Sequence, residues 1–160
     1  MAATRGTFAF GRIVLDTRQV FFESPLSYAT VNLKPLVEGH VLVLPKRCID
    51  RFNLLNDDEV TDLWRSVHRV SRALEGHYKC DAFTFAIQDG KHAGQSVPHV
   101  HVHVLPRRIG DFTPNDAIYT ALDVHNANPL QVEHDDLRPP RSVEEMQREA
   151  DVLRSLFMQT

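Results

Sequence analysis

Apolar and polar residues alternate along the first third of the chain in short runs that glycines and prolines interrupt. Such alternation is typical of β-strands with one buried face. Because the gaps between the runs are short, neighbouring strands are expected to pair antiparallel. The last run is apolar on both faces, which favours a central strand. The predicted strands cover residues 8–16, 19–24, 26–33 and 40–45.

The period of the apolar residues changes after Asn56. Asn56 and Glu59 have the spacing of a capping box, in which the two side chains bond the free N–H groups of the first turn. The residues that follow predict an amphipathic helix of about five turns. Its apolar stripe consists of Val60, Leu63, Trp64, Val67, Val70 and Leu74.

Alternation returns in residues 81–90, with Phe83, Phe85 and Ile87 on one predicted face. We expect this strand to pair with residues 98–106, because a compact loop that contains glycine joins the two. A second capping box, at Ser142 and Glu145, begins the closing helix. The apolar stripe of that helix consists of Val143, Met146, Ala150, Leu153 and Phe157.

The regular pattern fades after Pro106, apart from a helical turn or two within residues 114–122. We expect a mobile loop around residues 123–141, where the chain is polar and contains prolines. An antiparallel β-sheet with two main helices segregated from it is an α+β fold. The length of 160 residues predicts a single domain over residues 1–160.

The composition excludes several classes of protein. A net charge of −3 gives no general attraction to nucleic acid or to an anionic membrane. There is no apolar run of about 20 residues and no secretory signal pattern. Cys48 and Cys80 have no disulfide or zinc-knuckle spacing, so a reducing, cytoplasmic location is expected. The basic pairs at 46–47 and 107–108 are expected to be solvated strand ends.

Residues 98–106, PHVHVHVLP, place a histidine at every second position. In a strand His99, His101 and His103 share one face, while the intervening valines face the core. A metal site is one interpretation. Since His99 and His103 lie about 13 Å apart on an extended chain, one ion would need a pair of these rings and ligands from elsewhere, for which His40, Asp89 and His92 are candidates. A solvent-facing strand is the second interpretation.

Chemistry by imidazole itself is the third interpretation, and the one that the sequence favours. An imidazole is neutral and nucleophilic near pH 7, and it also acts as an acid or a base there. One ring can attack phosphorus while its neighbours bind a charged group or protonate a leaving group. Gly94, Gln95 and Ser96, just before the histidines, suit an anionic oxygen.

The stretch QSVPHVHVHV resembles the signature of the histidine triad superfamily, in which three histidines alternate with hydrophobic residues. Segments 27–47, 83–112 and 115–119 are similar to the fragile histidine triad branch, whose members hydrolyse diadenosine polyphosphates. The resemblance extends from Phe8 to the closing helix and is weakest over residues 123–141. Residues 88–90 and 105–107 favour this branch over the nucleoside phosphoramidases of the same superfamily.

The resemblance implies roles for four histidines. His101 matches the nucleophile that attacks the α-phosphorus and becomes linked to AMP. His103 matches the residue that contacts the phosphate and assists the leaving group. His99 and His40 match the pair that orients the nucleophile.

The resemblance also implies the substrate-binding positions. Asn32 matches the residue that holds the ribose hydroxyls, and Gln88 matches a phosphate contact. The loop before the histidines matches further substrate contacts, and three apolar residues are candidates for the base slot. These positions are Gly94, Gln95, Ser96 and Val97 in the loop, and Phe10, Leu33 and Leu42 in the slot.

By this resemblance the chain is expected to be an enzyme, a bis(5'-adenosyl)-triphosphatase that forms AMP and ADP through a covalent histidine-AMP intermediate. The expected partners are the dinucleoside polyphosphate, the AMP product and a second copy of the chain, with the sheet continued across the homodimer. No tightly bound cofactor or metal is expected, although magnesium or manganese can accompany the substrate. The alternatives are a nucleoside phosphoramidase and a dinucleotide-sensing signalling module with slow turnover.

Overall fold

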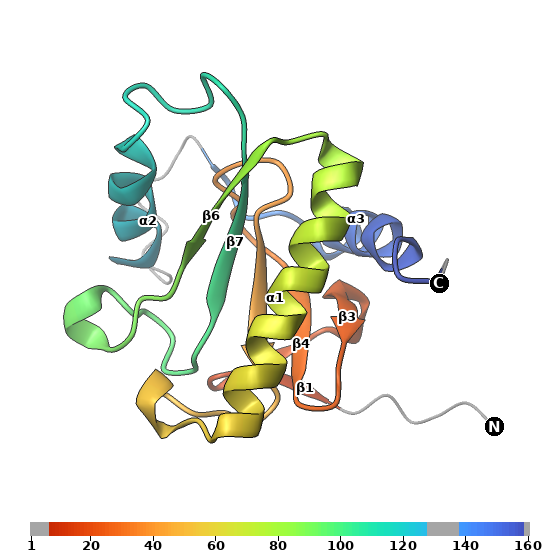
Figure 1. Ribbon diagram of the computed structural model, residues 1–160, viewed down its shortest axis with the longest axis vertical. Helices are drawn as coiled ribbons and strands as arrows, with labels where there is room; N and C mark the ends of the chain where they lie inside the picture. Colours follow the sequence, from red (N-terminus) through yellow and green to blue (C-terminus); the bar gives the residue numbers. More distant parts are fainter. Residues whose placement is uncertain (1–6, 128–137, 159–160) are drawn as a thin grey trace.

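The computed structural model describes residues 7–127 and 138–158, and it has the expected α+β architecture (Figure 1). A five-stranded antiparallel sheet has the strand order β3-β4-β5-β7-β6, and β1 and β2 form a separate hairpin. The strands are β1 (Phe8–Phe10), β2 (Ile13–Leu15), β3 (Val20–Glu23), β4 (Ser27–Val31), β5 (Val41–Pro45), β6 (Ala82–Ala86) and β7 (Val102–Arg107). The helices are α1 (Asp57–Tyr78), α2 (Ala117–Ala127) and α3 (Val143–Ser155), with short 3-10 turns η1 (Thr17–Gln19), η2 (Phe52–Leu54) and η3 (Lys91–Ala93).

The main core lies between one face of the sheet and the helices α1 and α3 (Figure 1). The valines that alternate with the histidines all belong to this core and are completely buried, as predicted. Val41 and Val43 of β5 point the same way. The side chains that alternate with these valines therefore face the opposite side of the sheet.

Both predicted capping boxes are present. Asn56 and Glu59 bond each other's backbone N–H groups at the start of α1, and Ser142 and Glu145 do the same at the start of α3. The stripe of α1 is buried at Leu63, Val67, Val70 and Leu74, whereas Val60 is half-buried and Trp64 is 41% exposed. Trp64 directly follows Leu63 and lies at the edge of the stripe, so its burial was not as expected.

The opposite face of the sheet has two smaller apolar clusters. One lies under the β1–β2 hairpin, where Phe8 packs on Tyr28 with the ring centroids 4.8 Å apart. The phenol of Tyr28 donates a hydrogen bond to the carbonyl of Ala9 over 2.5 Å, which holds the hairpin on the sheet. The other cluster joins α2 to the sheet through Leu105, Ile118 and Leu122. The hairpin and α2 thus cover different parts of this face.

Helix α2 is longer than the pattern predicted. The loop expected around residues 123–141 begins inside α2, and residues 128–137 lie outside the described residues. Residues 138–141 precede α3, and Arg141 N–H donates to the carbonyl of Leu33 over 3.0 Å. The chain therefore returns to the end of β4 before α3 begins. Within 7–127 and 138–158, none of the helices has the length and apolar character needed to cross a bilayer.

Arg107 is not the solvated strand end that the sequence predicted. It is 7% exposed, and its guanidinium pairs with Asp111 over 2.7 Å and donates to Thr84 and Asn115. The ion pair lowers the pKa of Asp111 to about 2. Asp111 and Asn115 lie in the turn that follows β7, whereas Thr84 lies on β6, a contact that local sequence does not reveal. This network holds the turn between β7 and α2.

Candidate active site

The three histidines lie on the sheet face that the hairpin covers. His103 is in β7, opposite Leu42 of β5 and Ala86 of β6. His99 and His101 precede the first residue of β7, so the regular strand holds one of the three rather than all of them. The backbone bends at His99, whose N–H donates to Val97 O over 2.8 Å. The rings of His101 and His103 lie side by side after this bend, with their centroids 5.1 Å apart.

All three rings are buried, with 0%, 3% and 1% of His99, His101 and His103 exposed. They are nevertheless outside the valine core, on the other face of the sheet. Burial disfavours the charged ring, and it lowers the pKa of His101 to about 4 and also lowers the pKa of His99. His101 is therefore a neutral imidazole at pH 7.

The hydrogen bonds determine which nitrogen of His101 carries the proton. Nδ1 of His101 lies 2.7 Å from the carbonyl oxygen of His99. A carbonyl only accepts, so the neutral ring places its proton on Nδ1 and leaves a lone pair on Nε2. Nε2 is thus the atom of His101 that can attack an electrophile.

His103 and His40 form a second chain of hydrogen bonds. The N–H of Leu36 donates to Nδ1 of His40 over 3.1 Å, so the proton of neutral His40 is on Nε2. That Nε2 lies 3.0 Å from Nδ1 of His103 and donates to it. Nε2 of His103 in turn carries a proton, which suits a hydrogen bond to phosphate or a proton transfer. His40 therefore contacts His103 directly.

Asn32 lies beside this chain at the end of β4. Its Oδ1 accepts from the N–H of Lys34, and its amide nitrogen is 3.3 Å from Nε2 of His40. Both nitrogens carry protons in this arrangement, so they are neighbouring donors and not a hydrogen-bonded pair. The Nε of Arg141 donates to the backbone carbonyl of Asn32 over 3.1 Å, and the NH1 group of Arg141 pairs with Glu149 of α3. The segment before α3 thus fixes the backbone of a candidate ribose-binding residue.

The residues predicted for the base slot are partly together. Phe10 of the hairpin meets the His101 ring edge to face at 4.9 Å, and Leu42 lies beside His103 on the same sheet face. Leu33 follows β4 and is 47% exposed. Phe10 and Leu42 therefore border the histidines, while Leu33 lies farther out, toward solvent.

The loop over residues 88–97 carries the remaining predicted contacts. The amide of Gln88 donates to Asp123 of α2 over 3.2 Å, and a Cβ at Gly94 would be 2.8 Å from that amide. Gln95 accepts from Gly90 N–H and donates to Asp50 O, so its side chain holds the loop. Ser96 is half-buried between Gln95 and Val97. Gln95 would contact a substrate through its backbone.

A metal ion has few possible ligands here. Asp89 accepts from Phe52 N–H and pairs with Arg51, away from the histidines. Over the part of the chain that the structure describes, no group of three or more His, Cys, Asp or Glu residues is arranged to hold a metal ion. The imidazoles are engaged with backbone groups and with one another instead.

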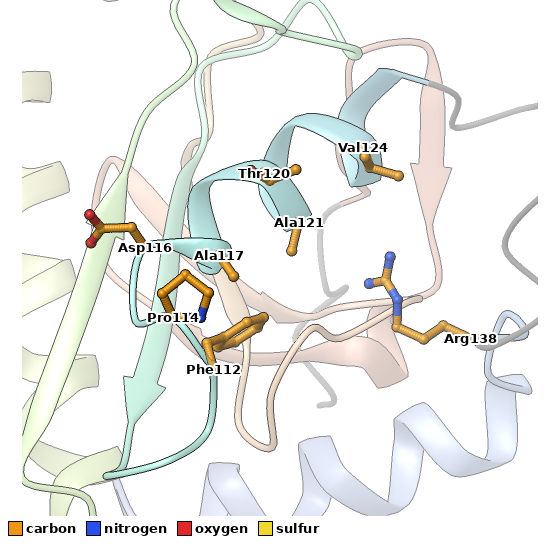
Figure 2. A pocket seen from close by; sticks show the side chains of 8 residues that line it. All are labelled: Phe112, Pro114, Asp116, Ala117, Thr120, Ala121, Val124 and Arg138. Carbon is orange, nitrogen blue, oxygen red and sulfur yellow. The ribbon is translucent and has the colours of Figure 1, made fainter.

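A hollow lies along α2, and none of the histidines lines it (Figure 2). Its volume is about 650 Å³, and Arg138 faces the helix across it. It is lined by Phe112, Pro114, Asp116, Ala117, Thr120, Ala121, Val124 and Arg138. Tyr119 on the same helix is 56% exposed and is not part of its lining.

Comparison with known proteins identifies the family. The HIT domain model matches residues 16–110, which include all three histidines and His40. The chain belongs to the HIT family. Two relatives place this HIT protein in the fragile histidine triad branch. One is the Arabidopsis thaliana bifunctional bis(5'-adenosyl)-triphosphatase/adenylylsulfatase FHIT, 49% identical over 98% of this chain and 88% of the relative. The other is the Dictyostelium discoideum bis(5'-adenosyl)-triphosphatase, 48% identical over 94% of this chain and 93% of the relative.

Solved structures of HIT proteins have the same fold. The Plasmodium falciparum diadenosine triphosphate hydrolase, in complex with cyclomarin A, has a TM-score of 0.78 at 28% identity and covers 99% of this chain and 89% of its own. The Caenorhabditis elegans NitFhit protein has a TM-score of 0.77 at 39% identity, and the match covers 97% of this chain and 31% of that larger one. A zinc-bound HIT protein of Mycobacterium smegmatis has a TM-score of 0.60 at 26% identity, and the match covers 88% of this chain and 84% of that one.

Proposed function

We propose that this HIT protein hydrolyses diadenosine polyphosphates, with diadenosine triphosphate as its preferred substrate and AMP and ADP as products. The observation that carries the proposal is the state of His101, a neutral imidazole with Nδ1–H held by a carbonyl and Nε2 left to attack. The 49% and 48% identity to bis(5'-adenosyl)-triphosphatases supports this substrate class.

The first chemical step forms a covalent intermediate. Nε2 of His101 bonds to the α-phosphorus while the bond from that phosphorus to the bridging oxygen of ADP breaks. The N–H at Nε2 of His103 donates a hydrogen bond to the departing oxygen and stabilises the negative charge that develops there, while the neutral ring keeps its proton. The carbonyl of His99 stabilises the positive charge that develops on the His101 ring.

The second step releases AMP. A water oxygen attacks the phosphorus and the bond from phosphorus to Nε2 of His101 breaks. One proton of the water stays on the AMP phosphate and the other is released to solvent. His101 is then again a neutral ring with its proton on Nδ1, so the cycle balances. Dividing the displacement into two steps and stabilising the leaving oxygen are the sources of acceleration.

The substrate is proposed to lie along the sheet face described above. Asn32 holds the ribose hydroxyls, Gln88 and the loop 94–97 bind phosphate oxygens, and Phe10, Leu33 and Leu42 border the base. Magnesium or manganese accompanies the polyphosphate, and the protein itself holds no tightly bound cofactor.

The assembly and the location are also part of the proposal. We propose a homodimer in which the sheets join, and the edge strand β6 with its 45% exposed Phe85 supports an interface there. The cytoplasmic location expected from Cys48 and Cys80, both unpaired, stays a prediction, and neither nucleic acid nor membrane is a proposed partner.

A product assay tests the function. Purified protein is incubated with diadenosine tri- and tetraphosphate, and the products are separated while quenched enzyme is weighed by mass spectrometry. We expect AMP and ADP from the triphosphate, at a higher rate than cleavage of the tetraphosphate, and one AMP bound per chain at His101. Absence of both turnover and adenylylated protein would exclude the hydrolase function.

Adenylyl sulfate is a second candidate substrate, because the Arabidopsis relative is named as an adenylylsulfatase as well. Sulfate is a better leaving group than ADP and places less demand on His103. The same assay with adenylyl sulfate and with adenosine phosphoramidate compares this activity and the phosphoramidase alternative directly. A slow hydrolase whose substrate-bound form persists would favour the sensing module.

A further inference from the structure

The tip of the β1–β2 hairpin makes a direct hydrogen bond to the first histidine of the triad. The backbone N–H of Gly11 donates to Nδ1 of His99 over 3.1 Å, across 88 positions of sequence. His99 itself is completely buried. The hairpin therefore does more than cover the histidines, because one of its backbone groups is bonded to a triad ring.

This bond determines the protonation of His99. Since Nδ1 accepts from Gly11, the proton of the neutral ring is on Nε2, which donates to the carbonyl of Pro45 over 2.8 Å. The ring is then fixed on both sides, by the hairpin and by the end of β5. The backbone carbonyl of the same residue is the group that holds Nδ1–H of His101.

The backbone at Gly11 suits only a residue without a side chain. Its φ is +60°, and a Cβ placed there would be 2.7 Å from Cγ1 of Val97, two residues before His99. A distance this short requires the Val97 side chain to rotate, or the hairpin or the 97–101 segment to move. The close approach of hairpin and loop at this point is what brings the Gly11 N–H within reach of His99.

We propose that Gly11 is a positioning residue, whose N–H fixes the tautomer and the place of His99 and, through the His99 carbonyl, the orientation of the nucleophile His101. This inference rests on the proposed hydrolase function. Phe10, which meets the His101 ring at 4.9 Å, is the neighbour of Gly11 in the hairpin. The hairpin that borders the base therefore also sets the ring that attacks phosphorus, so base binding and nucleophile alignment are coupled.

A matched pair of glycine variants tests the proposal. Gly11→Ala introduces a methyl group at positive φ and against Val97, whereas Gly110→Ala introduces one at φ +78° with nothing within 4 Å. Both variants carry the same kind of backbone strain, so Gly110→Ala controls for it. We expect Gly11→Ala to slow adenylyl transfer to His101 by ~10²-fold, the cost of a misaligned reacting group, and Gly110→Ala to react at the wild-type rate.

A spectroscopic measurement separates positioning from loss of structure. Nitrogen-15 shifts of the imidazoles in free protein report the tautomers, and wild type is expected to show His99 protonated at Nε2 and His101 at Nδ1. Gly11→Ala is expected to change the His99 signals, and Gly110→Ala to leave them unchanged. Unchanged His99 signals in folded Gly11→Ala, or equal loss of rate in both glycine variants, would overturn the proposal.

A second pair of variants decides the matter if Gly11→Ala does not fold. His99→Asn keeps an acceptor where Nδ1 meets Gly11, while His99→Gln keeps a donor where Nε2 meets Pro45. We expect His99→Asn to retain at least about tenfold more adenylyl transfer than His99→Gln, a difference of about 1.4 kcal/mol. Equal or greater activity of His99→Gln contradicts the proposal. If wild type does not hydrolyse the substrate, the function fails, while the tautomer measurement still decides the role of Gly11.

Discussion

The carbonyl oxygen of His99 lies 2.7 Å from Nδ1 of His101 and accepts the proton of that neutral ring. Two residues of the same motif are thus joined through a backbone group of one and a side chain of the other. The two residues are separated by one valine, as alternate histidines of the motif are. The chain bends at His99, where the N–H of His99 donates to Val97 O.

Replacement of His101 by Asn is expected to abolish hydrolysis of diadenosine triphosphate, by more than ~10³-fold, because no nitrogen lone pair remains to form the intermediate. Product formation is measured with purified variant, and thermal unfolding shows that the fold persists. Turnover near the wild-type rate would exclude His101 as the nucleophile.

His103→Ala tests the proposed hydrogen bond to the leaving oxygen. The variant lacks the donor at Nε2, so we expect ~10²–10³-fold slower cleavage of diadenosine triphosphate. The leaving oxygen of an AMP ester of an acidic phenol needs less stabilisation, so cleavage of that ester should fall far less. The two substrates are compared with the same enzyme preparation. An equal loss on both would assign His103 to phosphate binding alone.

The buried histidines make the folded state sensitive to acid. The pKa of His101 is about 4 in the folded chain and ~6.5 when unfolded, so the unfolded state binds the proton first as pH falls. The contribution of neutral His101 to the free energy of unfolding is fully present above pH ~6.5. It falls by up to about 3 kcal/mol as the pH decreases to about 4. Urea unfolding at pH 7 and pH 5 measures the loss, which His101→Asn should reduce. It should not remove the loss, since the pKa of His99 is also lowered.

Arg141→Gln is expected to raise the KM for diadenosine triphosphate about tenfold with little change in kcat. The variant loses charged hydrogen bonds to the carbonyl of Asn32, worth ~1.5–3 kcal/mol, and frees the backbone of the residue that we propose binds the ribose. Arg148→Gln, an exposed position in α3, is the control. A fall in kcat with unchanged KM would show that Arg141 acts on the chemistry instead.

Removal of metal provides a further prediction. Protein dialysed against a strong chelator is expected to keep its full rate once magnesium is restored with the substrate, because the imidazoles are bonded to backbone carbonyls and to each other. Metal analysis of the purified protein accompanies the assay. Stoichiometric zinc whose content tracks activity would contradict this, and the zinc-bound Mycobacterium smegmatis relative makes the comparison informative.

The sequence predicted the strands, the two main helices and the face on which the histidines lie. Those features follow from local periodicity and capping, which are visible within a single segment of sequence. Examples are the capping pair Asn56 and Glu59, and the valines that alternate with the histidines. The family and its branch were also predicted from the QSVPHVHVHV motif and its surroundings, and the family model and the relatives confirmed them. The roles of the individual site residues stay predictions.

Contacts between distant segments were not predictable from one sequence. Residues 8–16 were predicted as one strand, whereas they form the β1–β2 hairpin with Gly11 at its tip, where the positive φ suits a glycine. Arg141 lay in the weakest part of the resemblance, and nothing local indicates that it reaches Asn32. The direct bond from His40 to His103 was not predicted, because each residue had been given a role from its own motif. The bond depends on the register of β5 against β7, which brings the two segments together.

Arg141 bonds the backbone of Asn32 from 109 positions later in the chain. During synthesis the ribosome therefore completes the whole histidine motif well before Arg141, which bonds the Asn32 carbonyl, has emerged. A nascent or truncated chain that ends before Arg141 would contain every triad histidine and still lack this anchor. An intact motif in a gene fragment is thus insufficient evidence of a working enzyme.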